Sequence, residues 1–257
     1  MNKTSIVMLA GQNEWTPIIY NALTKELEVD AVILEDRVPR GVFLRTRIEN
    51  LDLFTVIGQQ LFKLTVVRFL QYVSKARIEE IKLRFRLDDS PIPPKYIIYV
   101  DSVNSEAARS HLMQLNPKVV VIFGTRIISK DTLKCIPAIF VNMHTGITPL
   151  YRGHAGGYWA LAREDPRNCG VSVHLVDEGI DTGPLLGQSL ISPTSADNFI
   201  TYSFLQIGVG IPLLIDVINQ ALNGQLKTRD FPEGPSKLWS HPTLWSYVKN
   251  LIFHNVK

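Results

Sequence analysis

An amide and an imidazole lie two residues apart near the middle of the chain, at Asn142 and His144. The apolar residues 139–141 before them are typical of the end of a buried strand, where side chains two apart project from the same face. An amide donor beside an imidazole can polarise a carbonyl group and move a proton. The pair therefore predicts a site for acyl transfer.

A carboxylate partner is predicted from a second segment. Residues 170–176 alternate as in a strand, and an acidic, glycine-containing loop follows at 177–183. Within that loop we predict Asp181 as the partner of His144, because a nearby carboxylate favours the imidazolium and raises the pKa of a histidine. Taken alone, Asn142 or His144 is typical of a polar residue that is hydrogen-bonded at the end of a strand and has no functional role. Together with Asn142, the combination favours the functional interpretation.

These spaced elements resemble the formyltransferase family that uses N10-formyltetrahydrofolate. That family includes glycinamide ribonucleotide transformylase, methionyl-tRNA formyltransferase and the sugar N-formyltransferases, and the chain is most similar to the last group. The resemblance spans about residues 5–222, is strongest over 119–186, and rests on Asn-x-His at 142–144, the Pro- and Gly-containing loop 149–153, the strand 170–176 and Ile-Asp-Thr-Gly-Pro at 180–184. Several spaced elements are more specific than one short motif.

The order of apolar and helical segments predicts an α/β fold. A strand at 5–10, a helix at about 16–27 and a strand at 29–34 form one β-α-β unit, which is expected to be right-handed and parallel. Further along, Ser195 is predicted to cap a long helix that ends near residue 223. The resemblance implies a Rossmann-like formyltransferase fold, a mostly parallel open sheet with helices on both faces.

The resemblance also implies the roles of individual residues. Asn142 and a protonated His144 would stabilise the oxyanion formed when an amine attacks the formyl carbon, and Asp181 would keep His144 charged. His174 is expected to support its strand or to line the site. The co-substrate is predicted to be N10-formyltetrahydrofolate, held by Thr125, Arg126, Ile127, Ile128, Asp177, Glu178 and Gly179. Ile127 and Ile128 alone would be equally typical of a core.

The acceptor amine is predicted mainly by exclusion. The turn at Gly11 lacks both the Gly-x-Gly-x-x-Gly spacing of dinucleotide sites and the phosphate loop of the glycinamide ribonucleotide transformylases. Methionyl-tRNA is disfavoured because the chain ends about where a second, RNA-binding domain is expected. A nucleotide-linked amino sugar is the predicted acceptor, and glycinamide ribonucleotide and methionyl-tRNA are the alternatives. A formyltetrahydrofolate hydrolase and a non-enzymatic binding module remain open.

We expect a catalytic domain at 1–224, with a helical insertion at about 37–94, and an extension at 225–257 that docks on the body. The insertion carries eleven Lys or Arg against six Asp or Glu. Amphipathic helices packing on the sheet are the simplest interpretation. A basic face that meets a nucleotide diphosphate or a membrane surface is the alternative. Polar side chains within 53–73 argue against a transmembrane segment.

The remaining composition is typical of a soluble globular protein. Two cysteines, Cys135 and Cys169, fit neither a disulfide framework nor a metal site, so no metal is predicted. The residues 1–4 run directly into an apolar strand without the pattern of a secretory signal, which predicts a cytoplasmic protein. The expected partner is a small-molecule amine rather than a nucleic acid, and a homodimer is left open.

Overall fold

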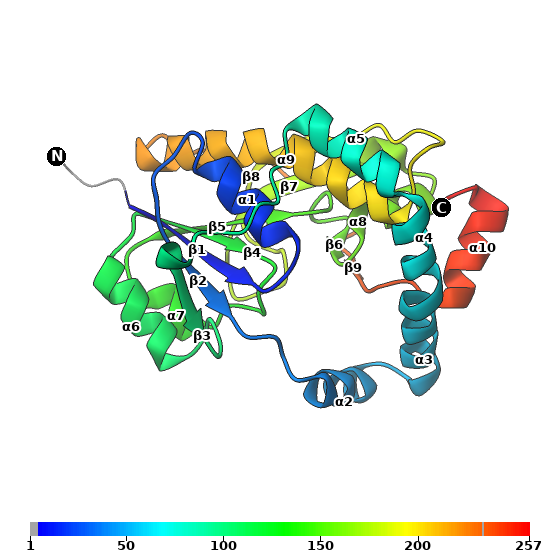
Figure 1. The fold of residues 1–257 in the computed structure, drawn as a ribbon, viewed down its shortest axis with the longest axis horizontal. Helices are drawn as coiled ribbons and strands as arrows, with labels where there is room; N and C mark the ends of the chain where they lie inside the picture. Colours follow the sequence, from blue (N-terminus) through cyan, green and yellow to red (C-terminus); the bar gives the residue numbers. More distant parts are fainter. Residues whose placement is uncertain (1–4, 233) are drawn as a thin grey trace.

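A seven-stranded mixed sheet forms the centre of the protein (Figure 1). The structure, a computed structural model, describes residues 5–232 and 234–257, so residues 1–4, considered above for a secretory signal, lie outside it. The strands are β1 (Ile6–Gly11), β2 (Val29–Glu35), β3 (Ile97–Val100), β4 (Val119–Phe123), β5 (Ile139–His144), β7 (Gly170–Leu175) and β8 (Leu185–Leu190).

The sheet has the order β3-β2-β1-β4-β5-β7-β8. Neighbouring strands from β3 to β5 are parallel, whereas β7 runs antiparallel to both β5 and β8. The predicted mostly parallel α/β fold is confirmed. Two short strands, β6 (Arg152–Gly153) and β9 (Leu238–Trp239), pair in a separate sheet. Because β9 follows β8, the last strand of the chain belongs to this small sheet.

Helices cover both faces of the large sheet, as predicted (Figure 1). Alternate residues of β1 explain this arrangement, since Ile6 and Met8 belong to one hydrophobic cluster and Val7 and Leu9 to the other. The helices are α1 (Trp15–Leu23), α2 (Arg40–Asn50), α3 (Leu53–Phe62), α4 (Arg68–Val73), α5 (Lys75–Phe85), α6 (Glu106–Leu115), α7 (Lys130–Lys134), α8 (Gly156–Ala162), α9 (Phe199–Leu222) and α10 (Leu244–His254). Shorter turns are η1 (Lys63–Val67), η2 (Pro94–Tyr96) and η3 (Pro166–Asn168).

The N-terminus of α9 differs from the sequence prediction. Asn198, not Ser195, is the N-cap, and its side chain accepts a hydrogen bond of 3.0 Å from the amide of Ile200. The backbone amide of Asn198 in turn donates to the hydroxyl of Thr201, which completes a capping box. Both Ser and Asn are good capping residues, so residue type alone does not choose between them.

After β2, the helix α2 leads away from the sheet, and α4 and α5 return along α9 (Figure 1). Between α2 and α5, the elements α3, η1 and α4 form one helical run over residues 53–73. The predicted packing of this segment on the sheet is wrong, because α4 and α5 pack on α9 and α3 packs on α10. The domain boundaries drawn around this segment remain a prediction.

Candidate active site

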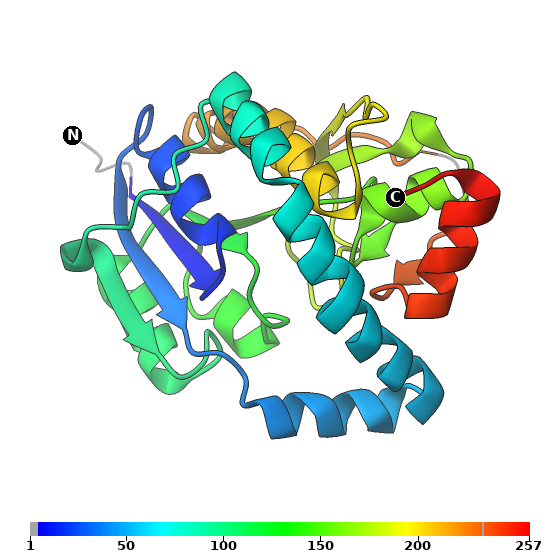
Figure 2. The same ribbon diagram turned by 45° about the vertical axis from the view of Figure 1, so that its right-hand side comes forward.

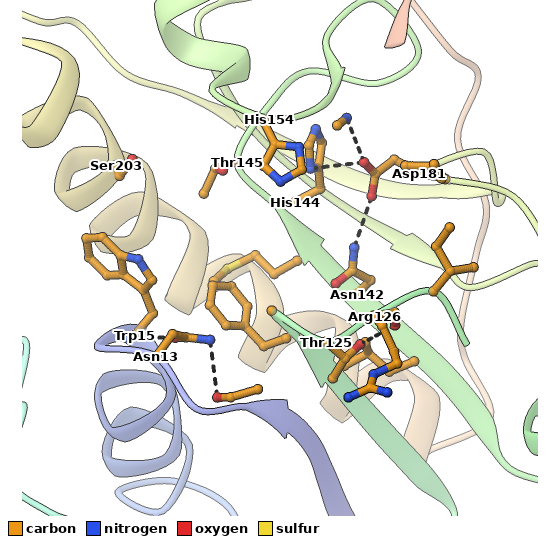
Figure 3. A pocket seen from close by; sticks show the side chains of 18 of the residues that line it. Asn13, Trp15, Thr125, Arg126, Asn142, His144, Thr145, His154, Asp181 and Ser203 are labelled. Carbon is orange, nitrogen blue, oxygen red and sulfur yellow. Dashed lines mark hydrogen bonds and ion pairs between the residues drawn. The ribbon is translucent and has the colours of Figure 1, made fainter. Parts of the chain in front are cut away.

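A cleft of about 1170 Å³ opens at the carboxyl ends of β1, β4 and β5. The strand order reverses direction between β1 and β4, and open α/β sheets bind ligands at such a point. Figure 3 shows Asn142 and His144 projecting from β5, with Trp15 of α1 and Ser203 of α9 across the cleft. The cleft has room for two substrates.

Asn142 and His144 lie side by side on β5, as their spacing predicts. The antiparallel pairing with β7 places His174 directly opposite Asn142. The side-chain amide nitrogen of Asn142 lies 3.2 Å from Nε2 of His174 and 3.3 Å from Oδ1 of Asp181. The strand register therefore adds a second imidazole to the pair found in the sequence.

Asp181 reaches this pair from the loop after β7 (Figure 3). Its Oδ2 atom lies 3.3 Å from Nδ1 of His144 and accepts a hydrogen bond of 2.9 Å from the amide of Gly153. The loop is held by Arg152, which donates to the carbonyl oxygen of Ile180 at 2.9 Å. The structure thus brings together the three residues that the sequence placed in one site.

Both ring nitrogens of His144 face acceptors. Nε2 lies 2.7 Å from the carbonyl oxygen of Tyr151, and Nδ1 faces the carboxylate of Asp181. A neutral imidazole carries one N–H, so only the imidazolium can donate to both. Burial nevertheless lowers the pKa of His144 below its ordinary value, although the facing Asp181 and the Tyr151 carbonyl act to raise it. The predicted rise in the pKa of His144 is therefore wrong, because desolvation outweighs the carboxylate.

Asp181 is held ionised at the centre of this cluster. Burial alone would raise its pKa, but His144, a hydrogen bond from His174 and the Gly153 amide together hold that pKa well below its ordinary value. Nε2 of His174 lies 3.4 Å from Oδ1 of Asp181. A buried carboxylate that stays charged can stabilise positive charge that develops beside it.

The loop after β4 forms one wall of the cleft and contains four predicted cofactor residues. Thr125, Arg126, Ile127 and Ile128 all line the cleft. The side chain of Ile127 is 56% exposed, whereas Ile128 is buried in the core. An apolar side chain available at the mouth of the cleft suits contact with a flat ring, and the buried neighbour anchors the loop.

Glu35, at the end of β2, fixes this loop and was missed by sequence reasoning. Its buried carboxylate accepts a hydrogen bond of 2.7 Å from the backbone amide of Arg126 and forms an ion pair with the side chain of the same residue. Asn104 adds a hydrogen bond of 2.8 Å to the carbonyl oxygen of Ile127. Nothing local in the sequence links these residues, since the contacts connect distant strands.

The acidic loop after β7 contains the remaining three residues that were predicted to bind the cofactor, and only two of them line the cleft. Asp177 and Gly179 line the cleft, and Oδ1 of Asp177 accepts from the amide of Gly179 at 3.0 Å and from the hydroxyl of Thr182 at 2.7 Å. Glu178 lies apart from the cleft lining and pairs with Lys130 at 3.1 Å. Its predicted role in cofactor binding has no support from this geometry.

Two further histidines, His154 and His241, line the cleft and were not predicted. Their ring centroids are 4.7 Å apart. Burial lowers the pKa of both side chains, and the neighbouring cations of Arg47 and Lys63 lower it further. Nδ1 of His241 is buried and has no hydrogen-bond partner among the described residues. This end of the cleft therefore has two cations nearby and a buried imidazole nitrogen without a partner among the described residues.

The extension 225–257 carries His241, and several hydrogen bonds hold this part of it beside the cleft. Gln59 of α3 donates to the carbonyl oxygen of His241 at 2.8 Å and to the hydroxyl of Ser240 at 3.1 Å, and it accepts from Arg47. The indole of Trp159 donates to the carbonyl oxygen of Ser240 at 2.8 Å. Within the described residues, no group of three or more His, Cys, Asp or Glu side chains is placed to hold a metal ion.

Residues 87–201 match the model of a protein family described as formyl transferase. A methionyl-tRNA formyltransferase from Thermodesulfovibrio yellowstonii is 37% identical over 115 residues, which are 44% of this chain and 37% of that protein. Another from Kosmotoga olearia is 30% identical over 128 residues, covering 49% of this chain and 40% of that protein. The chain thus spans less than half the length of these relatives.

Solved structures with similar folds cover nearly the whole chain. A sugar N-formyltransferase from Shewanella superposes with a TM-score of 0.55 at 14% identity, covering 96% of this chain and 87% of that one. A phosphoribosylglycinamide formyltransferase from Anaplasma phagocytophilum superposes with a TM-score of 0.56 at 13% identity, covering 92% and 98%. At such low identity these likenesses establish the fold.

Proposed function

We propose that this chain, whose residues 87–201 match the formyl transferase family model, transfers a formyl group from N10-formyltetrahydrofolate to a primary amine. The observation that carries the proposal is the convergence of Asn142, His144 and Asp181 in one cleft. An amide, an imidazole and a carboxylate supply the hydrogen-bond donor and the proton acceptors that acyl transfer to an amine requires.

The geometry suggests how these residues divide the chemistry. As the amine attacks, a bond forms between its nitrogen and the formyl carbon, and the bond from that carbon to N10 of the folate breaks. Asn142 donates to the formyl oxygen as it gains negative charge. A neutral His144 keeps Nδ1 on Asp181, while Nε2 leaves the Tyr151 carbonyl and accepts the proton that the amine loses. The resulting imidazolium is stabilised by Asp181 and passes that proton to N10 as the folate leaves.

The co-substrate is proposed to lie along the loop after β4. Thr125, Arg126, Ile127 and Ile128 line one side of the cleft, and Asp177 and Gly179 line the side nearest Asp181. The fixed backbone of the loop and the exposed face of Ile127 suit a flat, hydrogen-bonding ring. When bound there, the folate supplies the formyl group within reach of Asn142 and His144.

A nucleotide-linked amino sugar is our proposed acceptor. The support is the end of the cleft where His154 and His241 line the wall and the cations of Arg47 and Lys63 lie close by. A diphosphate carries negative charge that such cations attract, and the rings of the two histidines offer polar contacts along the wall. The acceptor is thus a small molecule, and the reaction is proposed to take place in the cytoplasm.

Methionyl-tRNA is the second candidate acceptor, because two relatives that match part of this chain are methionyl-tRNA formyltransferases.

The experiment is a screen in which the purified protein and N10-formyltetrahydrofolate are mixed with one acceptor at a time. The acceptors tested are nucleotide-linked amino sugars, glycinamide ribonucleotide and methionyl-tRNA. A reaction without any amine is included to detect hydrolysis. Formylation of the sugar nucleotides is expected; formylation of another acceptor alone, or folate turnover without amine, refutes this assignment.

A further inference from the structure

The outer face of the helical run 53–73 is apolar, which is unusual for a surface helix. Phe54, Ile57, Leu61 and Leu64 are exposed and are spaced by three or four residues, so they share one side of the helix. Further along, Phe69 and Tyr72 are 64% and 72% exposed. The opposite side is also apolar, because Val56, Phe62 and Leu70 are buried.

The last helix, α10, extends the same surface. Trp245 stacks on Phe54 with ring centroids 4.0 Å apart, and α3 and α10 are packed together. Figure 2 shows α10, in red, beside the helical run 53–73 in blue and cyan. We call this surface the apolar face, made of the exposed residues Phe54, Ile57, Leu61, Leu64, Phe69, Tyr72, Trp245, Val248, Leu251, Ile252 and Phe253.

Cations predominate among the charges on these helices, although Asp52 caps the start of α3 and Glu79 and Glu80 lie on α5. Residues 53–78 contain four Lys or Arg and no Asp or Glu, and residues 244–257 contain two Lys and no Asp or Glu. Arg68, Lys75 and Lys249 are exposed on these helices. Aliphatic and aromatic side chains flanked by cations are the composition of helices that lie in the interface of an anionic bilayer.

The helical run is held against the protein and is therefore not free to cross a bilayer. It is long and apolar enough to do so by composition, but Phe62 packs in the core and Gln59 is hydrogen-bonded to the tail. The other helix of that length and composition, α9, is mostly buried. A helix fixed on one side with an apolar outer face can lie only in the plane of the interface.

We propose that the apolar face binds the surface of a membrane that contains anionic lipids. The aromatic and aliphatic side chains would enter the boundary between headgroups and acyl chains, and Arg68, Lys75 and Lys249 would contact the lipid phosphates. This inference goes beyond formyl transfer and does not depend on it. It makes the protein a peripheral membrane protein that keeps its cleft in the aqueous phase.

A second copy of the chain is a poorer occupant of this surface. A two-fold dimer buries the same patch from both copies, so it would bring the exposed cations Arg68, Lys75 and Lys249 of two copies together. Anionic lipid headgroups supply the missing negative charge. Charge complementarity therefore favours the bilayer over self-association.

The experiment is flotation of the full chain with vesicles of phosphatidylcholine, alone or mixed with phosphatidylglycerol. Binding to the mixed vesicles is expected, with weaker binding at high salt. The double variant Phe69→Glu/Ile252→Glu should weaken it by more than about tenfold, because both side chains lose apolar contact and add negative charge. The matched control is Met113→Glu on α6, an equally apolar residue that is 53% exposed on another surface; it should bind like the unaltered protein.

Tryptophan fluorescence provides a readout of location. Trp245 lies in the apolar face, so brominated phosphatidylcholine in the mixed vesicles should quench emission, and Trp245→Phe should remove most of that quenching. Circular dichroism confirms that each variant is folded. Absence of binding to the mixed vesicles overturns the proposal. So does a concentration-dependent dimer in sedimentation that the double variant abolishes, because a second copy would then occupy the face.

Discussion

Nδ1 of His144 lies 3.3 Å from Oδ2 of Asp181, and this contact joins the end of β5 to the loop after β7. His144 is buried, the side chain of Asp181 is 12% exposed, and its carboxylate also accepts a hydrogen bond from the amide of Gly153. The histidine is thereby placed between a charged acceptor and the carbonyl of Tyr151. Its protonation state is set by the competition between these acceptors and burial.

The substitution Asp181→Asn tests the contribution of the charge. The amide keeps the size of the side chain but cannot stabilise an imidazolium at His144, so kcat should fall by about 10²- to 10³-fold. Steady-state kinetics and circular dichroism on the same sample measure activity and folding. Asp216→Asn, on the exposed side of α9, is the matched control and should keep full activity. An active Asp181→Asn protein would exclude the proposed role.

The pH dependence of kcat/KM reports the titration of His144. Burial lowers its pKa, and the neutral ring is the proposed proton acceptor, so activity should fall only as pH drops through a value below the ordinary range of histidine. Asp181 acts to raise that pKa. In the residual activity of Asp181→Asn the acidic limb should therefore move to still lower pH; movement to higher pH would contradict this assignment.

Glu35 is expected to act through the loop after β4 rather than on the reacting atoms. Glu35→Gln weakens the ion pair and hydrogen bond that fix Arg126, so the KM for N10-formyltetrahydrofolate should rise by about tenfold while kcat changes less. Glu106→Gln, on the surface of α6, is the control. An effect confined to the KM for the amine would show that the loop does not contact the folate.

His241 is expected to affect the acceptor alone. If its ring contacts the diphosphate, His241→Ala should raise the KM for a nucleotide-linked amino sugar by about tenfold and leave the KM for the folate unchanged. His111→Ala on α6 serves as the control. An unchanged KM for the sugar nucleotide would remove His241 from the acceptor site.

A buried ion pair ties the helix α5 to the start of α9. Arg77 contacts Asp197 through two hydrogen bonds of 2.9 Å and 3.1 Å, and Asp197 is buried. Asp197→Ala removes these two hydrogen bonds while Arg77 keeps its exposed partner Glu80, so the free energy of unfolding should fall by about 1.5–3 kcal/mol in denaturant titrations. Glu49→Ala, which breaks the exposed pair with Arg45, should change it by less than about 0.5 kcal/mol.

The same pair has a predictable pH dependence. Burial opposes ionisation of Asp197, but the hydrogen bonds from Arg77 hold its pKa below the ordinary value. A carboxyl group with a depressed pKa stabilises the fold above its unfolded-state pKa, and that stability is lost as pH falls towards the folded-state value. The unfolding free energy should therefore fall in acid less steeply for Asp197→Ala than for the unaltered protein. Equal slopes would contradict this explanation.

Local patterns predicted the parts of the molecule that depend on neighbours in sequence. The alternation along β5 correctly placed Asn142 and His144 on one side, and the apolar runs predicted the parallel part of the sheet. Asp181 was predicted as the partner of His144 from its residue type in an acidic loop, although no local rule brings that loop to the end of β5. Within α9, the cap depended on the hydroxyl of Thr201 and so escaped a rule based on residue type.

Other features depend on burial and on long-range packing, which the sequence does not display. The lowered pKa of His144 follows from desolvation that only the folded protein reveals. His241 belongs to the tail and reaches the cleft because Gln59 of α3 holds its backbone. Glu35 ends a strand that is distant in sequence from the loop it anchors. None of these contacts leaves a spacing pattern in the chain.

The most direct test of formyl transfer is the stoichiometry of the reaction. Purified protein is given N10-formyltetrahydrofolate and a nucleotide-linked amino sugar, and the tetrahydrofolate released and the formamide formed are measured together. We expect equal amounts of the two products, both dependent on the amine and both lost in Asn142→Ala and Asp181→Asn. Folate release without formamide, or equal transfer by these two variants, would contradict the central claim.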